Sequence, residues 1–142
     1  MNSPGLNPGV KISATSEAPF KTQLVHGPSG AKLITEPPAD NGGTGAAFSP
    51  TDLVASALVS CALTTMALTA HREGIVWGGA GGTVEKVMSP PPRKIAELSV
   101  VFQMPTGLTE EQRRHLEEVA RQCPVARSLH PDLRLPFKFV YP

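Results

Sequence analysis

The middle of the chain contains an uncharged run of 18 residues, Leu53-Val-Ala-Ser-Ala-Leu-Val-Ser-Cys-Ala-Leu-Thr-Thr-Met-Ala-Leu-Thr-Ala70. Ser49 and Pro50 come just before it, and serine at the N-cap followed by proline at the first helical position is a typical helix start. Gly74 comes just after it, and glycine is the usual residue beyond a helix C-terminus. We therefore expect one long helix from about Pro50 to Glu73.

The length of this run reaches the lower limit for a membrane span. Its many Ala, Ser and Thr residues are weakly apolar, however, and suit close packing inside a protein better than contact with lipid. The first ten residues contain no basic segment followed by an apolar one, so they do not resemble a secretory signal. We therefore expect no membrane partner, a cytoplasmic location, and cysteines that start out as thiols.

Length and composition bound the function further. The chain has 142 residues, 13 Lys and Arg against 12 Asp and Glu, and a net charge of +1. No polybasic run is present, so the sequence offers no electrostatic footprint for nucleic acid. Two cysteines cannot form the dense disulfide framework of a small secreted scaffold. The expectation is one domain with an ordinary hydrophobic core.

The rest of the chain predicts an α+β fold. Residues 1–19 are rich in Pro, Gly and Ser and are expected to form a flexible tail before a single domain over 20–142. Thr109 and Gln112 form a capping box that starts a second helix, and Pro124 breaks that helix and begins a short helical turn over 124–129. Alternating or turn-bounded segments predict strands over 21–26, 31–36, 83–88, 94–104 and 133–141. The order β-β-α(long)-β-β-α-β favours a mainly antiparallel sheet packed on the long helix.

A Gly-rich loop over 37–45 connects the early strands to the long helix. Its backbone can approach a ligand or partner closely, and an ordinary mobile connection explains the composition equally well. The sequence leaves both interpretations open.

The candidate reactive groups are Cys61 and Cys123. Cys61 lies in the middle of the long helix, too far from its N-terminus for the macrodipole to favour a thiolate, and a cysteine there is often a small buried hydrophobic residue. Cys123 precedes Pro124, where a helix start and the nearby Arg121 and Arg127 favour a thiolate. The two thiols can meet in space, but their spacing in the sequence does not show whether they do.

Other site chemistry has little support. The four histidines have none of the spacings of metal-binding motifs, and no Walker-type phosphate loop, GxSxG motif or dinucleotide-binding glycine motif is present. We therefore expect neither a metal nor a bound cofactor.

Two segments together carry a resemblance: Phe48-Ser-Pro-Thr-Asp-Leu-Val-Ala-Ser-Ala-Leu-Val-Ser-Cys61 and Cys123-Pro-Val-Ala-Arg-Ser-Leu129. They resemble the OsmC/Ohr family of osmotically inducible and organic hydroperoxide resistance proteins, in particular its OsmC-like branch. The family hallmarks are a Ser/Asn-Pro-x-Glu-Leu helix start that leads to a cysteine, and a later Cys-Pro. Spacing and element order match over about residues 20–142.

The resemblance implies an intertwined homodimer with the long helices at its centre and thiol sites at the subunit interface. It also implies thiol-dependent reduction of organic hydroperoxides in oxidative stress defence. Cys61 would be the peroxidatic cysteine, which becomes a sulfenic acid, and Cys123 the resolving cysteine, which converts it to a disulfide. An external dithiol would then reduce the disulfide.

The sequence departs from the family pattern at the activating residues. Peroxidases of the family pair an Arg from an early strand with a Glu at the helix start, whereas here no Arg precedes Arg72 and the early strands offer only Lys21 and Lys32. Thr51 takes the place of the Glu, and Asp52 matches the looser pattern of the OsmC-like branch. Asp52 is therefore a third candidate catalytic residue, or simply a helix cap.

These departures keep two alternatives open. One is a non-catalytic OsmC-like dimeric module that binds a small hydrophobic ligand. The other is that both thiols are core residues without a redox role.

Overall fold

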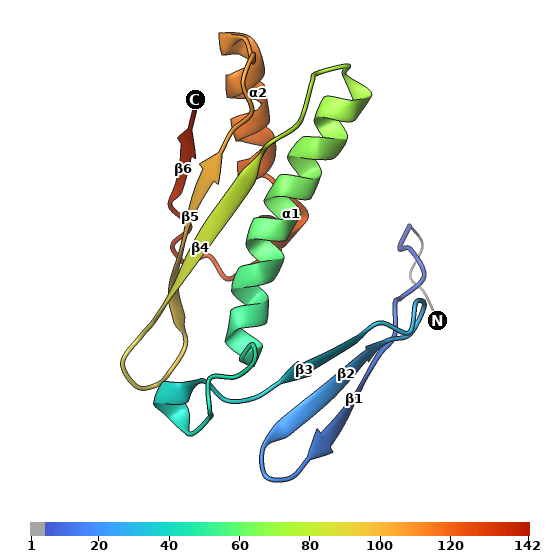
Figure 1. Ribbon diagram of the computed structural model, residues 1–142, viewed down its shortest axis with the longest axis vertical. Coiled ribbons are helices and arrows are strands. Elements are labelled where there is room, and N and C mark those ends of the chain that lie inside the picture. The colour runs from blue at the N-terminus through green and yellow to red at the C-terminus, as the bar shows by residue number, and fades with distance from the viewer. Residues whose placement is uncertain (1–4) are drawn as a thin grey trace. The chain divides into compact units, whose positions relative to one another are not determined.

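The computed structural model describes residues 5–142 of the chain (Figure 1). Contacts between the elements divide the chain into two compact units, the first ending at Thr51 and the second extending from Asp52 to Pro142. In chain order the elements are β1 (Ile12–Glu17), β2 (Lys21–His26), β3 (Lys32–Thr35), the 3-10 helix η1 (Ala39–Asn41), α1 (Pro50–Arg72), β4 (Gly81–Met88), β5 (Ile95–Gln103), α2 (Glu110–Arg121), α3 (Pro124–Ser128) and β6 (Phe137–Val140).

The first unit is built on an antiparallel sheet in the order β1-β2-β3. Among residues 5–51 the buried side chains are polar, namely Thr35, Glu36 and Ser49. Leu33 and Ile34, on opposite faces of β3, are 38% and 43% exposed. Residues 5–51 therefore do not form an apolar core of their own on this sheet.

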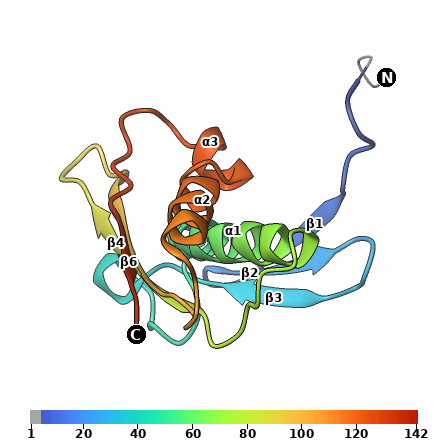
Figure 2. The same ribbon diagram turned by 90° about the horizontal axis from the view of Figure 1, so that it is seen from above.

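The second unit contains the hydrophobic core. Its sheet has the order β4-β5-β6, in which β4 and β5 are antiparallel and β5 and β6 are parallel. Alternate residues of β5 lie on one face, and α1 and α2 pack against that face (Figure 2). The core side chains come from α1, β5, α2 and the adjoining loops: Ala55, Leu58, Ala62, Met66, Leu98, Val100, Phe102, Met104, Leu108, Leu116, Ala120 and Cys123.

The helix α1 ends within one residue of the predicted boundary, and Gly74 follows it with a left-handed φ of 68°. Its buried residues form one stripe: Ala55, Leu58, Ala62, Met66 and Ala70. Within residues 5–142, α1 is long and apolar enough to span a membrane by length and composition alone. Only 28% of its most apolar 18-residue window is buried, so much of the helix surface is uncovered in one chain.

The predicted α+β class and mainly antiparallel pairing are confirmed, with three differences in detail. The strand β1 lies inside the segment 1–19 that composition predicted to be a flexible tail; residues 1–4 are outside the described part. All six residues of β1 are exposed, so it has no apolar pattern to detect, and it forms because it pairs with the whole of β2. The last strand is shorter than predicted, because only Phe137–Val140 pairs continuously with β5, and it runs parallel to β5.

Candidate functional site

Cys61 and Cys123 come from different elements of the second unit. Cys61 lies in the middle of α1, and Cys123 is the N-cap of α3, with Pro124 at the next position. Proline lacks the N–H that a helix interior needs, so α2 ends before it and the chain starts a new helical turn. Because α2 packs with α1 in one core, this turn lies against the middle of α1.

The two thiol groups meet. The Val125 N–H donates a hydrogen bond to Cys61 Sγ over 3.5 Å, and the Cys61 thiol lies close enough to Cys123 to raise the pKa of that thiol. Both cysteines are free thiols. The contact that the sequence left open therefore exists in the fold.

The surroundings of the two thiols differ. Cys123 is completely buried, whereas Cys61 is half-buried. Burial raises the pKa of Cys123; the Ala126 amide opposes this shift, and the neighbouring Cys61 thiol adds to it. Cys123 is therefore a protonated thiol at neutral pH, not the thiolate that its place at a helix start favoured, and Cys61 is the more exposed of the two.

Such a pair can perform two-step thiol chemistry. An accessible thiol reacts with an electrophile once it ionises, and a protonated thiol in contact with it can condense with the oxidised product before further oxidation occurs. Within residues 5–142, no group of three or more His, Cys, Asp or Glu is arranged to hold a metal ion.

Asp52, the third candidate, lies in the first turn of α1. It precedes Cys61 by nine residues, which is about 13 Å along a helix axis. Its Oδ1 pairs with Lys86 Nζ at 2.8 Å, and the Lys86 side chain is 14% exposed. This ion pair joins the start of α1 to β4, away from the two sulfur atoms.

Arg121, which the sequence suggested as a source of positive charge near Cys123, has other partners. Its guanidinium lies 5.0 Å from the centre of the Phe139 ring and 3.8 Å from a Glu117 carboxylate oxygen. The Arg121 guanidinium therefore interacts with side chains of α2 and β6. Arg127 is exposed on α3.

Sequence reasoning missed Glu36, a carboxylate that is only 2% exposed. Its Oε1 accepts hydrogen bonds from the Thr44 and Ala46 amides at 3.0 and 3.1 Å, and from the Thr44 hydroxyl. The Gly-rich loop is therefore closed around a buried acceptor. The sequence offered one signal for Glu36, namely its position at the end of a predicted strand and directly before the Gly-rich loop.

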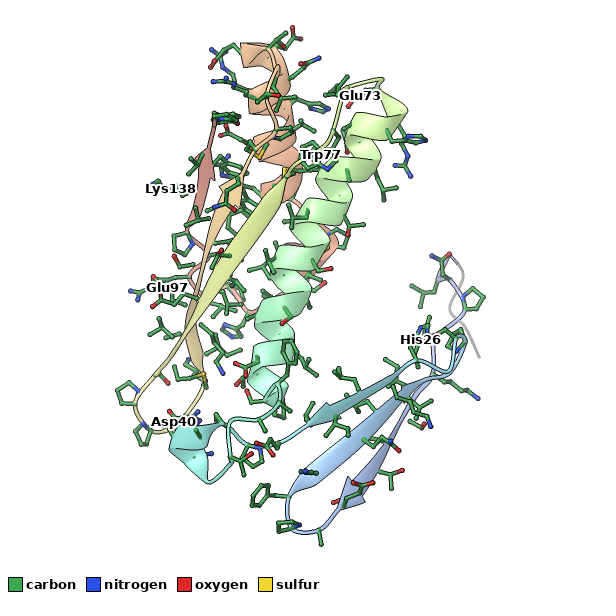
Figure 3. The ribbon with its side chains drawn as sticks, in the orientation of Figure 1. His26, Asp40, Glu73, Trp77, Glu97 and Lys138 are labelled. Atoms are coloured by element: carbon green, nitrogen blue, oxygen red, sulfur yellow. The ribbon has the colours of Figure 1, made fainter. Side chains whose placement is uncertain are left out.

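A second feature that the sequence did not indicate is a hydrogen bond just beyond the end of α1. Glu73, labelled in Figure 3, hydrogen-bonds through Oε2 to His115 Nε2 of α2 at 2.7 Å. It is about 18 Å beyond Cys61 at the rise of an α-helix, so it is separate from the thiols. A surface pocket of about 450 Å³ surrounds the pair and is lined by Glu73, Ile75, Thr109, Glu111, Gln112 and His115.

Comparison with known proteins agrees with this architecture. Residues 43–136 match the family model of the OsmC-like proteins. A Psychrobacter arcticus structure, provisionally named an osmotic stress induced and detoxification response protein, is 32% identical, with 96% of this chain and 99% of that chain covered and a TM-score of 0.88. No curated protein matches the chain.

More distant structures share the fold. The organic hydroperoxide resistance protein OsmC of Legionella pneumophila is 18% identical, with 93% and 96% of the two chains covered and a TM-score of 0.74. An organic hydroperoxide resistance protein from Elizabethkingia anophelis is 17% identical, with 97% and 99% covered and a TM-score of 0.78. The matched family model and the 32% identity over nearly the whole length lead to one conclusion: the chain belongs to the OsmC-like protein family.

Proposed function

We propose that the protein reduces organic hydroperoxides with the thiols of Cys61 and Cys123, as part of oxidative stress defence. The observation that carries the proposal is the contact between an accessible thiol with an amide donor and a buried, protonated thiol. Structural relatives that are named organic hydroperoxide resistance proteins support the substrate class.

In the proposed reaction, the Cys61 thiolate attacks the outer oxygen of the hydroperoxide. The O–O bond breaks, and the alkoxide leaves and takes a proton from solvent to become an alcohol. Cys61 is then a sulfenic acid, and the hydroperoxide has been reduced by two electrons. The Cys123 sulfur attacks the Cys61 sulfur, a disulfide forms, and one water molecule leaves.

The disulfide must be reduced before the next turnover. A dithiol does this by thiol–disulfide exchange, and in the process becomes a disulfide itself. We propose an external dithiol of this kind as the second partner. We also propose a cytoplasmic location, where thiols are kept reduced.

The proposal includes a homodimer in which a second copy covers α1. Two observations support it: most of the apolar window of α1 is uncovered in one chain, and residues 5–51 bury no apolar core of their own. A helix of this composition in water needs its uncovered face to be packed. Neither nucleic acid nor a membrane is a proposed partner.

Two cysteine variants test the reaction. Cys61→Ser is expected to abolish consumption of cumene hydroperoxide, because the attacking sulfur is lost. Cys123→Ser is expected to allow about one turnover, after which Cys61 is over-oxidised because no resolving thiol is present. Consumption by Cys61→Ser is measured with a dithiol in excess, and consumption by Cys123→Ser without added thiol, because a free dithiol would itself condense with the sulfenic acid. Ser60→Ala at an exposed neighbour on α1 is the control.

Equal activity of the two cysteine variants would contradict the proposal. Mass spectrometry after one equivalent of hydroperoxide provides a second test. Loss of two hydrogens and a peptide linked through residues 61 and 123 are expected.

A second candidate function is a dimeric module that binds a small hydrophobic ligand without catalysis. The observation that favours it is that, among the described residues 5–142, the groups found beside Cys61 Sγ are uncharged, namely an amide, a hydroxyl and a thiol. Thiols that stay unmodified after stoichiometric hydroperoxide would favour this alternative over the enzyme.

A further inference from the structure

The first observation concerns what surrounds Cys61 Sγ. Reactive cysteines commonly have a cationic side chain or a helix N-terminus beside the thiolate. Here the Val125 amide and the Cys123 thiol contact the sulfur, and the Thr65 hydroxyl oxygen lies 3.9 Å from it. Any stabilisation of the thiolate by these groups must come from hydrogen bonds rather than from a full charge.

The second observation concerns the Thr65 hydroxyl. Thr65 is one helical turn after Cys61, so the two side chains lie on the same face of α1. Its hydroxyl currently donates to the Cys61 carbonyl oxygen at 2.7 Å. That carbonyl also accepts the ordinary helical N–H bond from the residue four positions on, so it keeps a partner if the hydroxyl turns away.

We propose that Thr65 is a second hydrogen-bond donor to the Cys61 thiolate: when Cys61 ionises, the hydroxyl proton turns from the Cys61 carbonyl to Sγ. The thiolate then has two neutral donors, the Thr65 hydroxyl and the Val125 amide. This inference rests on the proposed function, because it concerns the sulfur that attacks the hydroperoxide.

Hydrogen bonds of this kind change reactivity in a definite direction. A donor to the charged form increases the fraction of thiolate at neutral pH. The nucleophilicity lost by each thiolate is smaller than the gain in its fraction, because reactivity depends only partly on basicity. Removing the Thr65 hydroxyl is therefore expected to slow every reaction of Cys61 at neutral pH.

The test uses the full chain with Cys123→Ser, in which Cys61 is the one remaining cysteine. Thr65→Val removes the hydroxyl and keeps the shape, whereas Thr65→Ser keeps the hydroxyl. Thr69→Val makes the same change one turn further from Cys61 and serves as the matched control. Alkylation of Cys61 by iodoacetamide is followed from pH 6 to 10, and thermal unfolding of each variant is recorded.

The expected result is that Thr65→Val slows alkylation at pH 7 several-fold, because one hydrogen bond to a charged group changes the thiolate fraction by about tenfold or more and the higher nucleophilicity of the remaining thiolate offsets part of that change. The midpoint of the pH profile moves upward. Thr65→Ser restores rate and midpoint, and Thr69→Val changes neither. An unchanged rate and midpoint in Thr65→Val overturn the proposal, and so does a Thr65→Ser variant as slow as Thr65→Val.

Alkylation needs no hydroperoxide, so this test is separate from the proposed activity. Consumption of cumene hydroperoxide is measured in parallel in chains that retain both cysteines. If Thr65 behaves as expected but the chain with both cysteines consumes no hydroperoxide, the donor role of Thr65 is supported and the proposed peroxidase activity is rejected. The opposite pattern rejects the donor role alone.

Discussion

At the scale of single residues, Glu36 shows how one carboxylate organises a loop. The Thr44 hydroxyl donates to it and lowers its pKa; burial opposes this shift, and the amides of Ala46 and Thr44 and the charge of Lys21 support it. Gly43 explains why the loop closes so tightly, because a Cβ there would lie 1.6 Å from the Pro37 carbonyl oxygen. The closed loop therefore depends on the ionised Glu36 carboxylate and on the absence of a side chain at Gly43.

A pH dependence follows for Glu36→Gln. Because the folded protein holds this pKa below its value of 4.5 in the unfolded chain, the ionised carboxylate stabilises the fold above pH 4.5. That contribution is lost as the pH falls through the lower, folded-state pKa. The wild type should therefore be more stable than Glu36→Gln at pH 7, and the difference should shrink below pH 4.5.

Urea unfolding at fixed protein concentration between pH 3 and pH 7 measures this difference. Glu85→Gln, at an exposed position of β4, is the control for loss of a carboxylate. A difference between wild type and Glu36→Gln that does not vary with pH would count against the role of the charge.

At the scale of elements, the approach of α1 to β4 depends on a residue without a side chain. A Cβ on Gly82 would lie 2.9 Å from Val59 Cγ2 and 3.4 Å from a ring carbon of Phe102. The first distance is shorter than van der Waals contact, so either the Val59 side chain would have to turn or helix and strand would have to move apart. The same helix carries Cys61, and its seating on the sheet sets where that thiol lies.

Gly82→Ala is accordingly expected to lower the free energy of unfolding by about 1–3 kcal/mol, the usual cost of overpacking a core. Gly78→Ala is the matched control, because nothing lies within 4 Å of a Cβ at Gly78 and its φ is not positive. Urea midpoints at equal protein concentration provide the measurement. Equal losses in both variants would contradict the packing argument.

At the scale of the whole molecule, the outer surface of α1 is the feature that a single chain leaves unexplained. Leu68 is 47% exposed on a helix whose uncharged run is long enough to span a membrane. The proposed second copy would cover this surface. Small residues along the uncovered face, such as Ala57 and Ser60, permit close packing of two helices.

Sedimentation velocity tests this arrangement. The wild type should sediment at twice the chain mass of 15.0 kDa. Leu68→Glu should shift the protein toward the single-chain mass, because a charge buried at the interface is costly. Val76→Glu, at an apolar residue that is 84% exposed outside the helix, should leave the mass unchanged. A wild type that stays at the single-chain mass, or that enters lipid vesicles, would rule out the dimer.

The elements with strong local signals were predictable from the sequence. The capping box of Thr109 and Gln112 forms both of its hydrogen bonds, and Gly74 follows α1 in the left-handed conformation that it was expected to adopt. The alternation of Leu98, Val100 and Phe102 matches the buried face of β5. In each case the interactions lie within a few residues, so the local sequence contains the physical cause.

Other features of the fold and the site depend on contacts between residues that are distant in the sequence. The strand β1 forms because β2 pairs with it, and β6 runs parallel to β5 because a long connection returns it in that direction. The sequence by itself named Cys61 and Cys123 as the candidate thiols. Packing of α1 with α2 brings them together, and the complete burial of Cys123 makes the two thiols chemically different. Burial is a property of the assembled core, and no short stretch of sequence determines it.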